Sequence, residues 1–206
     1  ANIYEVSKAI GTDSRIGLKF LNPGPGFGGS CFKKDILNLV YLCRNYGLED
    51  VAEYWEQVVK LNEYQKNRFS EIVIRHFNGE LHNKNISILG WAFKKNTNDS
   101  RESASIYITY QLLKLGFKVN IYDPMVSRKK ILKDINALDQ KRGELNEDYL
   151  SKIQVYETLE SIVSTCKIIT ILTEWDEFLS IEKISSDYEI FDFRNILNKK
   201  SVKLRL

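Results

Sequence analysis

Residues 86–123 read "ISILGWAFKKNTNDSRESASIYITYQLLKLGFKVNIYD", and this stretch contains the pattern that decides the fold. Two short apolar runs, 86–90 and 118–123, flank a segment of helical periodicity at 104–116. Further short apolar or helical segments follow at 153–157, 158–166, 168–173 and 188–193. Strands that alternate with helices form parallel strand–helix–strand units. The sequence therefore predicts an α/β domain with a doubly wound parallel sheet.

The part of the chain before this domain is predicted to be helical, apart from a loop rich in glycine and proline. A helix is expected to end at Gly11, and residues 49–76 form a helical pattern roughly 40 Å long. Such a helix either bridges two domains, packs on another subunit, or is an ordinary solvent-backed helix. Its expected apolar face comprises Val51, Trp55, Val58, Leu61, Phe69, Ile72 and Val73. Asn78, Gly79 and Asn83 interrupt the pattern, so the domains are expected at 1–82 and 83–206.

Composition excludes several classes of protein. The net charge of the 206 residues is only +3 and basic residues alternate with acidic ones, which gives nucleic-acid binding no support. We find no apolar run long enough to cross a membrane and no signal-peptide pattern. The three widely spaced cysteines suggest neither a disulfide framework nor a metal site, so a cytoplasmic location is expected. The chain begins without Met and inside a helical pattern, so it is expected to be part of a longer protein.

Ligands of a doubly wound sheet bind beyond the carboxyl ends of its strands. The segment after the first strand lacks a glycine fingerprint but offers Lys94, Lys95 and Arg101 before a helix start, which suits a phosphate or is simply a solvated basic loop. Asp123 could hold a ribose hydroxyl or end a strand in a turn. Arg194 could reach a sugar or phosphate, or be a salt-bridged surface arginine.

The stretch "GFGGSCFKKD", residues 26–35, places a thiol after flexible glycines and before two lysines and an aspartate. If Ser30 caps a helix, Cys31 lies in its first turn, with Lys34 and Asp35 one turn later. The buried face of that helix would comprise Phe32, Ile36, Leu39, Val40 and Cys43. A helix start and neighbouring lysines favour a thiolate nucleophile, and Asp35 could orient water or accept a proton. The alternative is a buried, inert cysteine.

The other thiols and the imidazoles are expected to have no catalytic role. Cys43 and Cys166 are interpreted as packing residues. His76 and His82 are interpreted as structural or exposed, because neither lies close to Cys31 in the sequence.

Several segments in the same order closely resemble the UDP-glucose 6-dehydrogenase family. They are "FLNPGPGFGGSCFKKDILNLVYL", "ILGWAFKKNTNDSRES", "YDP", "TEWDEF" and "FDFRN". Members of that family have an NAD-binding Rossmann domain, a helical central domain and a Rossmann-like UDP-sugar-binding domain. The resemblance implies that this chain holds the later part of the central domain and the whole last domain, without the NAD-binding domain.

The family's chemistry implies roles for individual residues. UDP-glucose is oxidised at C6 to UDP-glucuronate with two hydride transfers to NAD, through a cysteine thiohemiacetal and thioester. By resemblance, Cys31 is the nucleophile, Asp35 assists proton transfer and positions water, and Lys34 and Arg101 contact NAD. No metal is implied. The implied substrate contacts are Arg15, which would serve a neighbouring subunit, and Phe20, Leu21, Asn22, Pro23, Gly24, Phe27, Gly28, Phe32, Phe93, Lys94 and Arg194.

The resemblance also implies a homo-oligomer, a dimer or a hexamer built from dimers, assembled through the long helix. The family's lysine and asparagine that polarise the reacting oxygen have no counterpart in this chain, so the chain alone is expected to turn over no substrate. The alternative functions are another nucleotide-sugar 6-dehydrogenase, acting on a UDP-N-acetyl sugar or GDP-mannose, and a non-catalytic nucleotide-sugar-binding or oligomerisation module.

Overall fold

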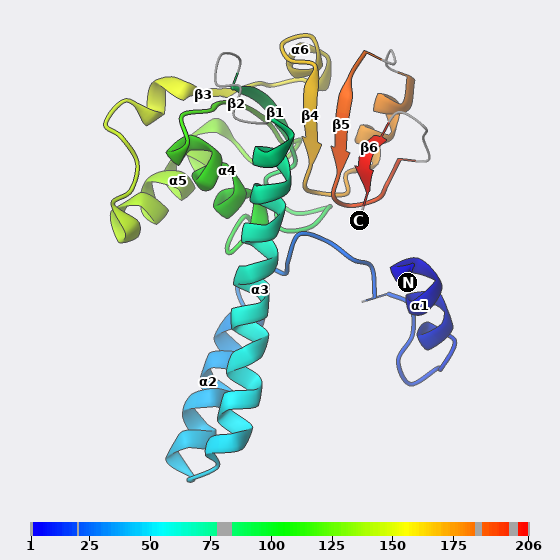
Figure 1. Ribbon diagram of the computed structural model, residues 1–206, viewed down its shortest axis with the longest axis vertical. Coiled ribbons are helices and arrows are strands. Elements are labelled where there is room, and N and C mark those ends of the chain that lie inside the picture. The colour runs from blue at the N-terminus through cyan, green and yellow to red at the C-terminus, as the bar shows by residue number, and fades with distance from the viewer. Residues whose placement is uncertain (1, 20, 78–83, 184–186, 198–201, 206) are drawn as a thin grey trace.

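A computed structural model describes residues 2–19, 21–77, 84–183, 187–197 and 202–205 (Figure 1). Three helices precede the sheet: α1 (Ile3–Gly11), α2 (Phe32–Asn45) and α3 (Glu49–His76). The α/β part then runs through β1 (Asn85–Leu89), α4 (Ala104–Lys114), β2 (Lys118–Tyr122), α5 (Arg128–Arg142), η1 (Tyr149–Lys152), β3 (Ile153–Val155), α6 (Leu159–Val163), β4 (Ile168–Ile171), η2 (Asp176–Lys183), β5 (Glu189–Asp192) and β6 (Val202–Arg205).

The strands form one parallel sheet in the order β3-β2-β1-β4-β5-β6. The order 3-2-1-4-5-6 is that of a doubly wound fold, so the predicted fold class is confirmed. Ile88 in the central strand β1 pairs in register with Ile121 of β2 and Thr170 of β4. All three side chains are fully buried. A strand covered on both faces carries a nearly continuous apolar run, which is why these strands were recognisable in the sequence.

The order in which the strands follow one another reverses between the parallel neighbours β1 and β4, and the carboxyl ends of these two strands lie close together. Gly90, directly after β1, has φ +96°, and a Cβ on it would lie 2.4 Å from Cβ of Thr173 after β4. Only glycine tolerates both conditions. Three segments therefore leave the sheet at the carboxyl ends of its parallel strands: 91–103 after β1, 174–178 after β4 and 193–195 after β5.

The elements α5, β6, η1 and η2 were not predicted from the sequence. Helix α5 is highly charged, and only Ile131 and Ile135 in it are buried, which leaves a weak apolar signal. Its ends follow ordinary rules: Ser127 caps the first turn, and Gly143 ends the helix with φ +64°.

Helix α3 belongs to two hydrophobic cores, which identifies it as a bridge between domains. Near its start, Ala52 packs with Ile36, Val40 and Cys43 of α2. Near its end, Phe69 and Val73 join the core of the α/β part, where the Phe69 ring meets Phe193 edge-on at 4.4 Å. The predicted bounds of this helix are confirmed, but two members of its expected apolar face, Val51 and Leu61, are exposed.

The carboxyl end of α3 is fixed to the sheet by His76. Its imidazole forms an ion pair with Glu189 and an edge contact with the ring of Phe191 at 5.1 Å. The structural role predicted for His76 is confirmed. His82 and the expected domain boundary after residue 82 lie outside the described residues, so the boundary stays a prediction.

Helix α1 lies apart from the helix pair α2–α3, and a long loop connects it to α2 (Figure 1). As predicted, it ends at Gly11. Across the described residues, we find no helix with both the length and the apolarity needed to span a membrane.

Candidate functional site

Cys31 is the N-cap residue of α2, and its side chain is exposed. Its carbonyl accepts the first backbone hydrogen bond of the helix, from the Asp35 amide at 2.9 Å. The prediction that Ser30 caps the helix is wrong: Ser30 precedes the cap position, and its Oγ lies 3.5 Å from Cys31 Sγ. The thiol is exposed, so the alternative of a buried cysteine is excluded.

The apolar face of α2 is only partly as predicted. Ile36, Val40 and Cys43 are buried and Leu39 packs against them. Phe32 is 56% exposed, so its predicted burial in this face is wrong. Phe32 is the first residue of α2, and its ring packs against the ring of Phe27 in the loop, with 4.7 Å between the ring centroids.

Arg101 brings positive charge to the exposed thiol. The pKa of Arg101 is raised, mainly by its hydrogen bonds to Asp99 and to a smaller extent by the negative charge of a Cys31 thiolate. Arg101 Nη2 lies 2.8 Å from Asp99 Oδ2. Lys34 and Asp35 are exposed in the first turn of α2. Arg101 and the first turn of α2 therefore lie on the same side of the thiol-bearing segment, where Ser30, Lys34 and Arg101 line one hollow.

The glycine loop before Cys31 is held by Asn62 of α3. The Phe27 amide donates to Asn62 Oδ1 at 2.8 Å, and Asn62 Nδ2 donates to the Phe27 carbonyl at 3.1 Å. Asn62 is only 5% exposed. Gly26, at φ +128°, leaves no room for a side chain, because a Cβ there would lie 2.7 Å from Asn62 Oδ1. Asn62 was not predicted as a site residue. A polar residue in a helix gives no sign in the sequence that it binds a loop residue 35 positions away.

The same loop packs against the segment that connects β1 to α4. The Gly29 amide donates to the Arg101 carbonyl at 2.7 Å, and a Cβ on Gly28 would lie 2.7 Å from the Glu102 carbonyl oxygen. A Cβ on Gly29 would lie 3.1 Å from the ring of Phe93. Phe93 is thus brought to the glycine loop, and the exposed Lys94 lies with Nζ 5.4 Å from the centroid of the Phe93 ring.

Arg194 lies beneath the first part of the loop. A Cβ on Gly24 would lie 2.5 Å from an Arg194 guanidinium nitrogen, and Arg194 Nη2 pairs with Glu174 at 2.5 Å. Arg194 and Asn22 line a hollow of about 350 Å³ together with Lys95, which pairs with Asp176. Arg194 is therefore both salt-bridged and placed at a hollow that could receive a ligand.

A second hollow of about 500 Å³ lies beside the start of α2. Ser30, Lys34 and Arg101 line it, with apolar side chains such as Leu37 and Leu138 on its other walls. Lys34 and Arg101 supply positive charge that suits an anionic group such as a pyrophosphate, and the acidic Glu102 and Asp134 line the same hollow. The two residues expected to contact a cofactor thus share one hollow.

Two expected site residues lie elsewhere or are not described. Arg15 is in the loop after α1, largely exposed, with Nη2 2.6 Å from Asp13 Oδ2, and the structure does not bring it to Cys31. Phe20 lies outside the described residues. Leu21 and Pro23 are half-buried in the loop that leads to Gly24.

Asp123 is occupied by structural hydrogen bonds. Its Oδ2 accepts from the amides of Trp91 and Ala92 at 2.6 and 2.9 Å and from the Trp175 indole at 3.1 Å. Its Oδ1 accepts from the amides of Met125 and Val126. Of the two roles considered for Asp123, the strand-ending turn is the one that the structure shows.

A network of charged residues next to Cys31 was missed in the sequence. Lys33 Nζ lies 3.0 Å from Glu102 Oε2 and 3.3 Å from Glu63 Oε1, and the Tyr107 hydroxyl donates to Glu102 at 2.6 Å. Lys66, 1% exposed, lies with Nζ 3.8 Å from the centroid of the Tyr107 ring. The spacing of these residues gave no signal, because they come from α2, α3, α4 and the loop before α4.

The remaining cysteines are packing residues, as predicted. Cys43 is buried in the core between α2 and α3. The half-buried Cys166 lies with Sγ 3.1 Å from the Asn85 carbonyl oxygen, and burial raises the pKa of its thiol. Within the described ranges, no group of three or more His, Cys, Asp or Glu side chains is placed to hold a metal ion.

Replacing Asn62 should release the glycine loop. Asn62→Ala leaves the Phe27 amide and carbonyl without their partner, which costs about 1–3 kcal/mol for each buried polar group left unsatisfied. We expect hydrogen exchange at the Phe27 amide to become faster while exchange in the core of β1 stays slow. Asn67→Ala, at an exposed position of the same helix, is the control. Unchanged protection of Phe27 in Asn62→Ala would contradict the assignment.

The network predicts a pH dependence of stability. Burial by itself would raise the pKa of Glu102, but hydrogen bonds from Tyr107 and Lys33 outweigh burial and lower it. Since the folded pKa lies below the unfolded value of about 4.3, the stabilisation is complete above roughly pH 5 and is lost as the pH falls through the folded pKa. Chemical unfolding of wild type and Glu102→Gln should therefore differ at neutral pH and converge in acid. A difference that grows on acidification would refute this, and Glu157→Gln, an exposed carboxylate, is the control.

Comparison with known proteins agrees with this arrangement. The model for the "UDP-glucose/GDP-mannose dehydrogenase family, UDP binding domain" matches residues 87–199, and that for the family's central domain matches residues 1–64. The chain is 43% identical to UDP-glucose 6-dehydrogenase of Drosophila melanogaster and 42% identical to UDP-glucose 6-dehydrogenase 4 of Arabidopsis thaliana, over 98% of its length in both cases. It spans only 44% and 45% of those relatives.

A solved structure resembles the whole chain. The UDP-glucose dehydrogenase of the archaeon Pyrobaculum islandicum superposes on 98% of this chain with a TM-score of 0.74 and 28% identity, over 42% of its own length. Fold, glycine loop and both matched domains lead to one conclusion. This chain belongs to the UDP-glucose/GDP-mannose dehydrogenase family.

Proposed function

We propose that this chain is the thiol-bearing and UDP-sugar-binding part of a UDP-glucose 6-dehydrogenase, which oxidises UDP-glucose to UDP-glucuronate in two NAD-dependent steps. The observation that carries the proposal is the exposed Cys31, located at the start of α2 between the glycine loop and Arg101. The two relatives compared above carry the name UDP-glucose 6-dehydrogenase, which supports this substrate over other nucleotide sugars. A binding-only module has no use for an exposed nucleophile at this position.

Cys31 would hold the sugar covalently at C6. Its thiolate adds to the aldehyde carbon, a carbon–sulfur bond forms, and the carbonyl oxygen takes up a proton to give a thiohemiacetal. After the second oxidation, C6 is a thioester. Water then adds to that carbon, and the carbon–sulfur bond breaks with its electron pair on sulfur, which releases the carboxylate. A polarisable thiolate suits both the addition and the departure.

Asp35 and the helix start would serve the proton transfers. Asp35 follows Cys31 by one helical turn and is exposed, so its carboxylate can orient water or accept its proton in the hydrolytic step. When the sulfur leaves with its electron pair, the start of α2 and the cation of Arg101 would offset the negative charge that it takes up.

The nucleotide sugar would lie along the loop from Phe20 to Gly28. Phe93 contacts this loop and offers an aromatic face to the uracil ring, and Lys94 is exposed beside it for the diphosphate. Arg194, with Asn22 and Gly24, would bind the sugar at the smaller hollow. Phe27 and Phe32 form an edge contact at the approach to Cys31.

The hollow lined by Lys34 and Arg101 would receive the pyrophosphate of NAD, because these two cations line it beside the start of α2. When bound, NAD accepts the hydride removed from C6. The residues of this chain would orient and neutralise the cofactor at its phosphates. Since the Arg101 carbonyl accepts the hydrogen bond of the Gly29 amide, two residues before Cys31, Arg101 would link the position of the cofactor to that of the thiol-bearing segment.

The protein is proposed to work in the cytoplasm. All three cysteines are free thiols, which fits a reducing compartment. An exposed nucleophilic thiol such as Cys31 also requires such conditions, because oxidation would consume it.

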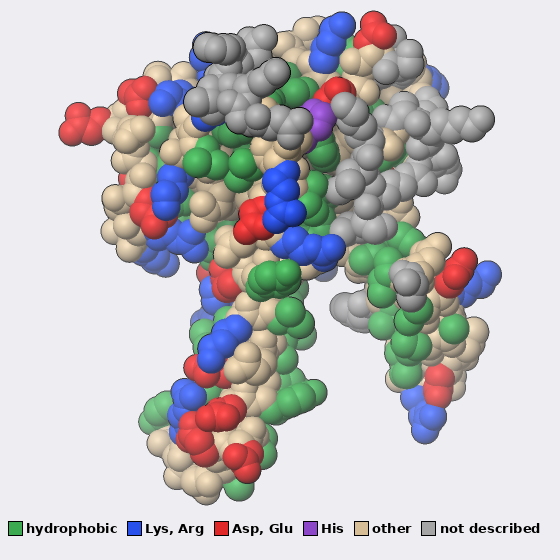
Figure 2. Space-filling view, viewed as in Figure 1, with side chains coloured by type: hydrophobic (Ala, Val, Ile, Leu, Met, Phe, Trp, Pro, Cys, Tyr) green, Lys and Arg blue, Asp and Glu red, His purple; other side chains and the backbone are tan. Residues whose placement is uncertain are grey.

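We further propose that the protein self-associates through α3. Tyr54, Leu61 and Tyr64 are 67, 65 and 61% exposed and line a hollow of about 520 Å³ on the outer face of that helix. Figure 2 shows hydrophobic side chains along this helix pair. An apolar surface of this kind on a helix is typical of a subunit interface. A second copy of the chain could present the same surface in return, as in a two-fold dimer.

Charge placed on this face should break the dimer. Leu61→Glu would bury an unpaired carboxylate in the interface, so light scattering should report a monomer where wild type is a dimer or larger. Leu150→Glu, at a 52% exposed position of η1, should leave the oligomer intact. A wild-type monomer, or an unchanged oligomer of Leu61→Glu, would contradict the proposal.

The nucleophile is tested in the protein that joins this chain to an NAD-binding domain. Cys31→Ser should lower formation of UDP-glucuronate by about three orders of magnitude or more, because an alkoxide of serine does not replace a thiolate in this exchange. NADH absorbance with UDP-glucose, a UDP-N-acetyl sugar and GDP-mannose measures both activity and substrate choice. Cys166→Ser is the control and should retain turnover.

Near-normal turnover by Cys31→Ser would remove Cys31 from its proposed role. The 206-residue chain alone should produce no NADH, and a clear signal from it would show that the chain needs no further residues for the reaction. Wild-type turnover with GDP-mannose but not with UDP-glucose would change the substrate while keeping the mechanism.

A further inference from the structure

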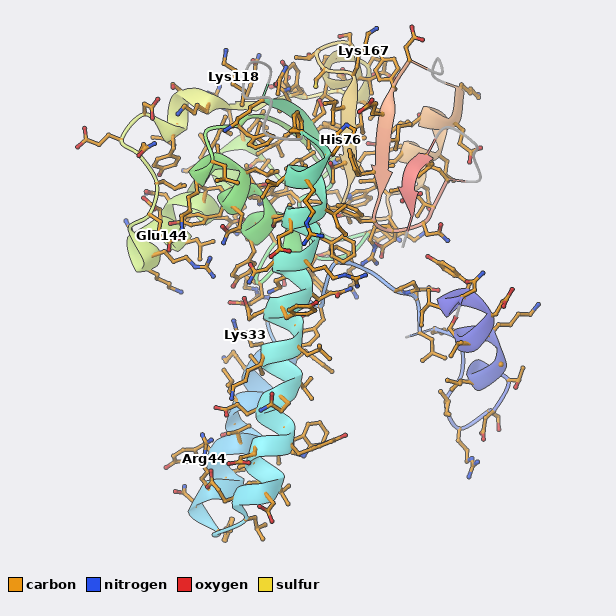
Figure 3. The ribbon with its side chains drawn as sticks, viewed as in Figure 1. Lys33, Arg44, His76, Lys118, Glu144 and Lys167 are labelled. Atoms are coloured by element: carbon orange, nitrogen blue, oxygen red, sulfur yellow. The ribbon has the colours of Figure 1, made fainter. Side chains whose placement is uncertain are left out.

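Lys33 is two residues from Cys31 but lies on the inner side of the helix start. Its side chain is 26% exposed and joins two carboxylates, Glu63 of α3 and Glu102 of the loop before α4. Figure 3 labels Lys33 on the α2–α3 pair, close to where that pair meets the α/β part. Lys33 and the neighbouring Lys34 both line the hollow beside the start of α2. Lys34 is exposed, whereas Lys33 is held by two carboxylates.

Glu102 touches the thiol-bearing segment with its backbone as well as its side chain. A Cβ on Gly28 would lie only 2.7 Å from the Glu102 carbonyl oxygen. The carbonyl of the neighbouring Arg101 accepts a hydrogen bond from the Gly29 amide. Glu102 itself has φ +55°, a left-handed conformation that is costly for a residue with a side chain. The surrounding contacts must hold it in that conformation. The Tyr107 hydroxyl, 2.6 Å from Glu102 Oε2, provides a fixed partner from α4.

Lys66 of α3 is the fourth charged residue of the network. Its ammonium lies over the ring of Tyr107 and 3.4 Å from Glu63 Oε1. Burial is the largest influence on Lys66 and lowers its pKa, against the attraction of Glu63 and Glu102. Two lysines and two glutamates thus connect α2, α3 and the loop before α4 around one half-buried tyrosine.

A partly buried ion pair of this kind contributes little net stability compared with an apolar replacement, because desolvation offsets the attraction between the charges. Its directional bonds can nevertheless define the relative position of the elements that carry it. Here those elements are the helix start that holds Cys31 and the loop that holds Arg101.

We propose that Lys33 and Glu102 are positioning residues for Cys31: their ion pair fixes the first turn of α2 to the 101–102 loop and so holds the sulfur beside Arg101. The inference rests on the proposed function in that Cys31 is the nucleophile. Burial would lower the pKa of Lys33, but the hydrogen bond to Glu102 and the charges of Glu102 and Glu63 raise it overall, so the pair stays charged at neutral pH.

The test uses the enzyme that joins this chain to an NAD-binding domain, as wild type, Lys33→Met, Lys33→Arg, Glu102→Gln and the Lys33→Met/Glu102→Gln double variant. Lys152→Met is the matched control, because Lys152 is 23% exposed and pairs with Asp148 at 3.1 Å in η1, outside the site. Three quantities are measured: kcat and KM for UDP-glucose, the rate of alkylation of Cys31 by iodoacetamide at one pH from its peptide mass, and the thermal midpoint.

In Lys33→Met we expect kcat to fall by about 10- to 100-fold with KM nearly unchanged, because a displaced nucleophile affects the reaction more than binding. Alkylation of Cys31 should slow by about 3-fold or more as the sulfur leaves the field of Arg101. Lys33→Arg should restore both values, Glu102→Gln should resemble Lys33→Met, and the double variant should be no worse than either single one. Lys152→Met should match wild type in kcat and alkylation.

The proposal is overturned if Lys33→Met keeps the wild-type kcat and alkylation rate, or if the losses of the two single variants add in the double variant. It is also overturned if the losses only follow the thermal midpoint and Lys33→Arg does not reverse them. If wild type itself forms no NADH from UDP-glucose, the proposed function is wrong. The alkylation rates then decide the positioning role alone.

Discussion

The approach of the glycine loop to the backbone at residues 101–102 is the contact on which the rest of the site depends. The Gly29 amide bonds to the Arg101 carbonyl at 2.7 Å, and Gly28 lies where any side chain would meet the Glu102 carbonyl. This contact joins a loop of the helical part to the edge of the sheet. Since Cys31 follows two residues later, the sulfur is located at the junction of the two parts rather than within either.

Helix α3 makes this junction rigid. Its first half shares a core with α2, and its second half is buried in the α/β part. Between these ends, Asn62 holds Phe27, and Glu63 and Lys66 reach the network around Tyr107. One continuous helix thus supports the thiol-bearing helix, the glycine loop and the sheet. Motion of either part relative to the other would have to bend the helix or break these contacts.

The site combines a closely packed glycine backbone with fixed charges. Glycines let the backbone come close to its neighbours, while Arg101 and Lys34 supply cations at one hollow and Arg194 supplies a cation at the other. Each arginine already has an acidic partner, Asp99 for Arg101 and Glu174 for Arg194. These partners orient the guanidinium groups before any ligand arrives, which lowers the ordering cost of binding an anion.

Three features could be predicted from the sequence: the alternation of strands and helices, the bounds of α3, and the place of Cys31 directly before a helix with an apolar face. Those properties are local, because they depend on periodicity and on glycine within a few residues. Helix α5 escaped notice, since only two of its residues are buried. The tertiary structure alone decided that Asn62 clamps Phe27, that Asp123 is consumed by backbone amides, and that Lys33 pairs with Glu102. Hydrogen bonds and ion pairs between residues far apart in the chain leave no periodic trace, so only the packing of the elements reveals them.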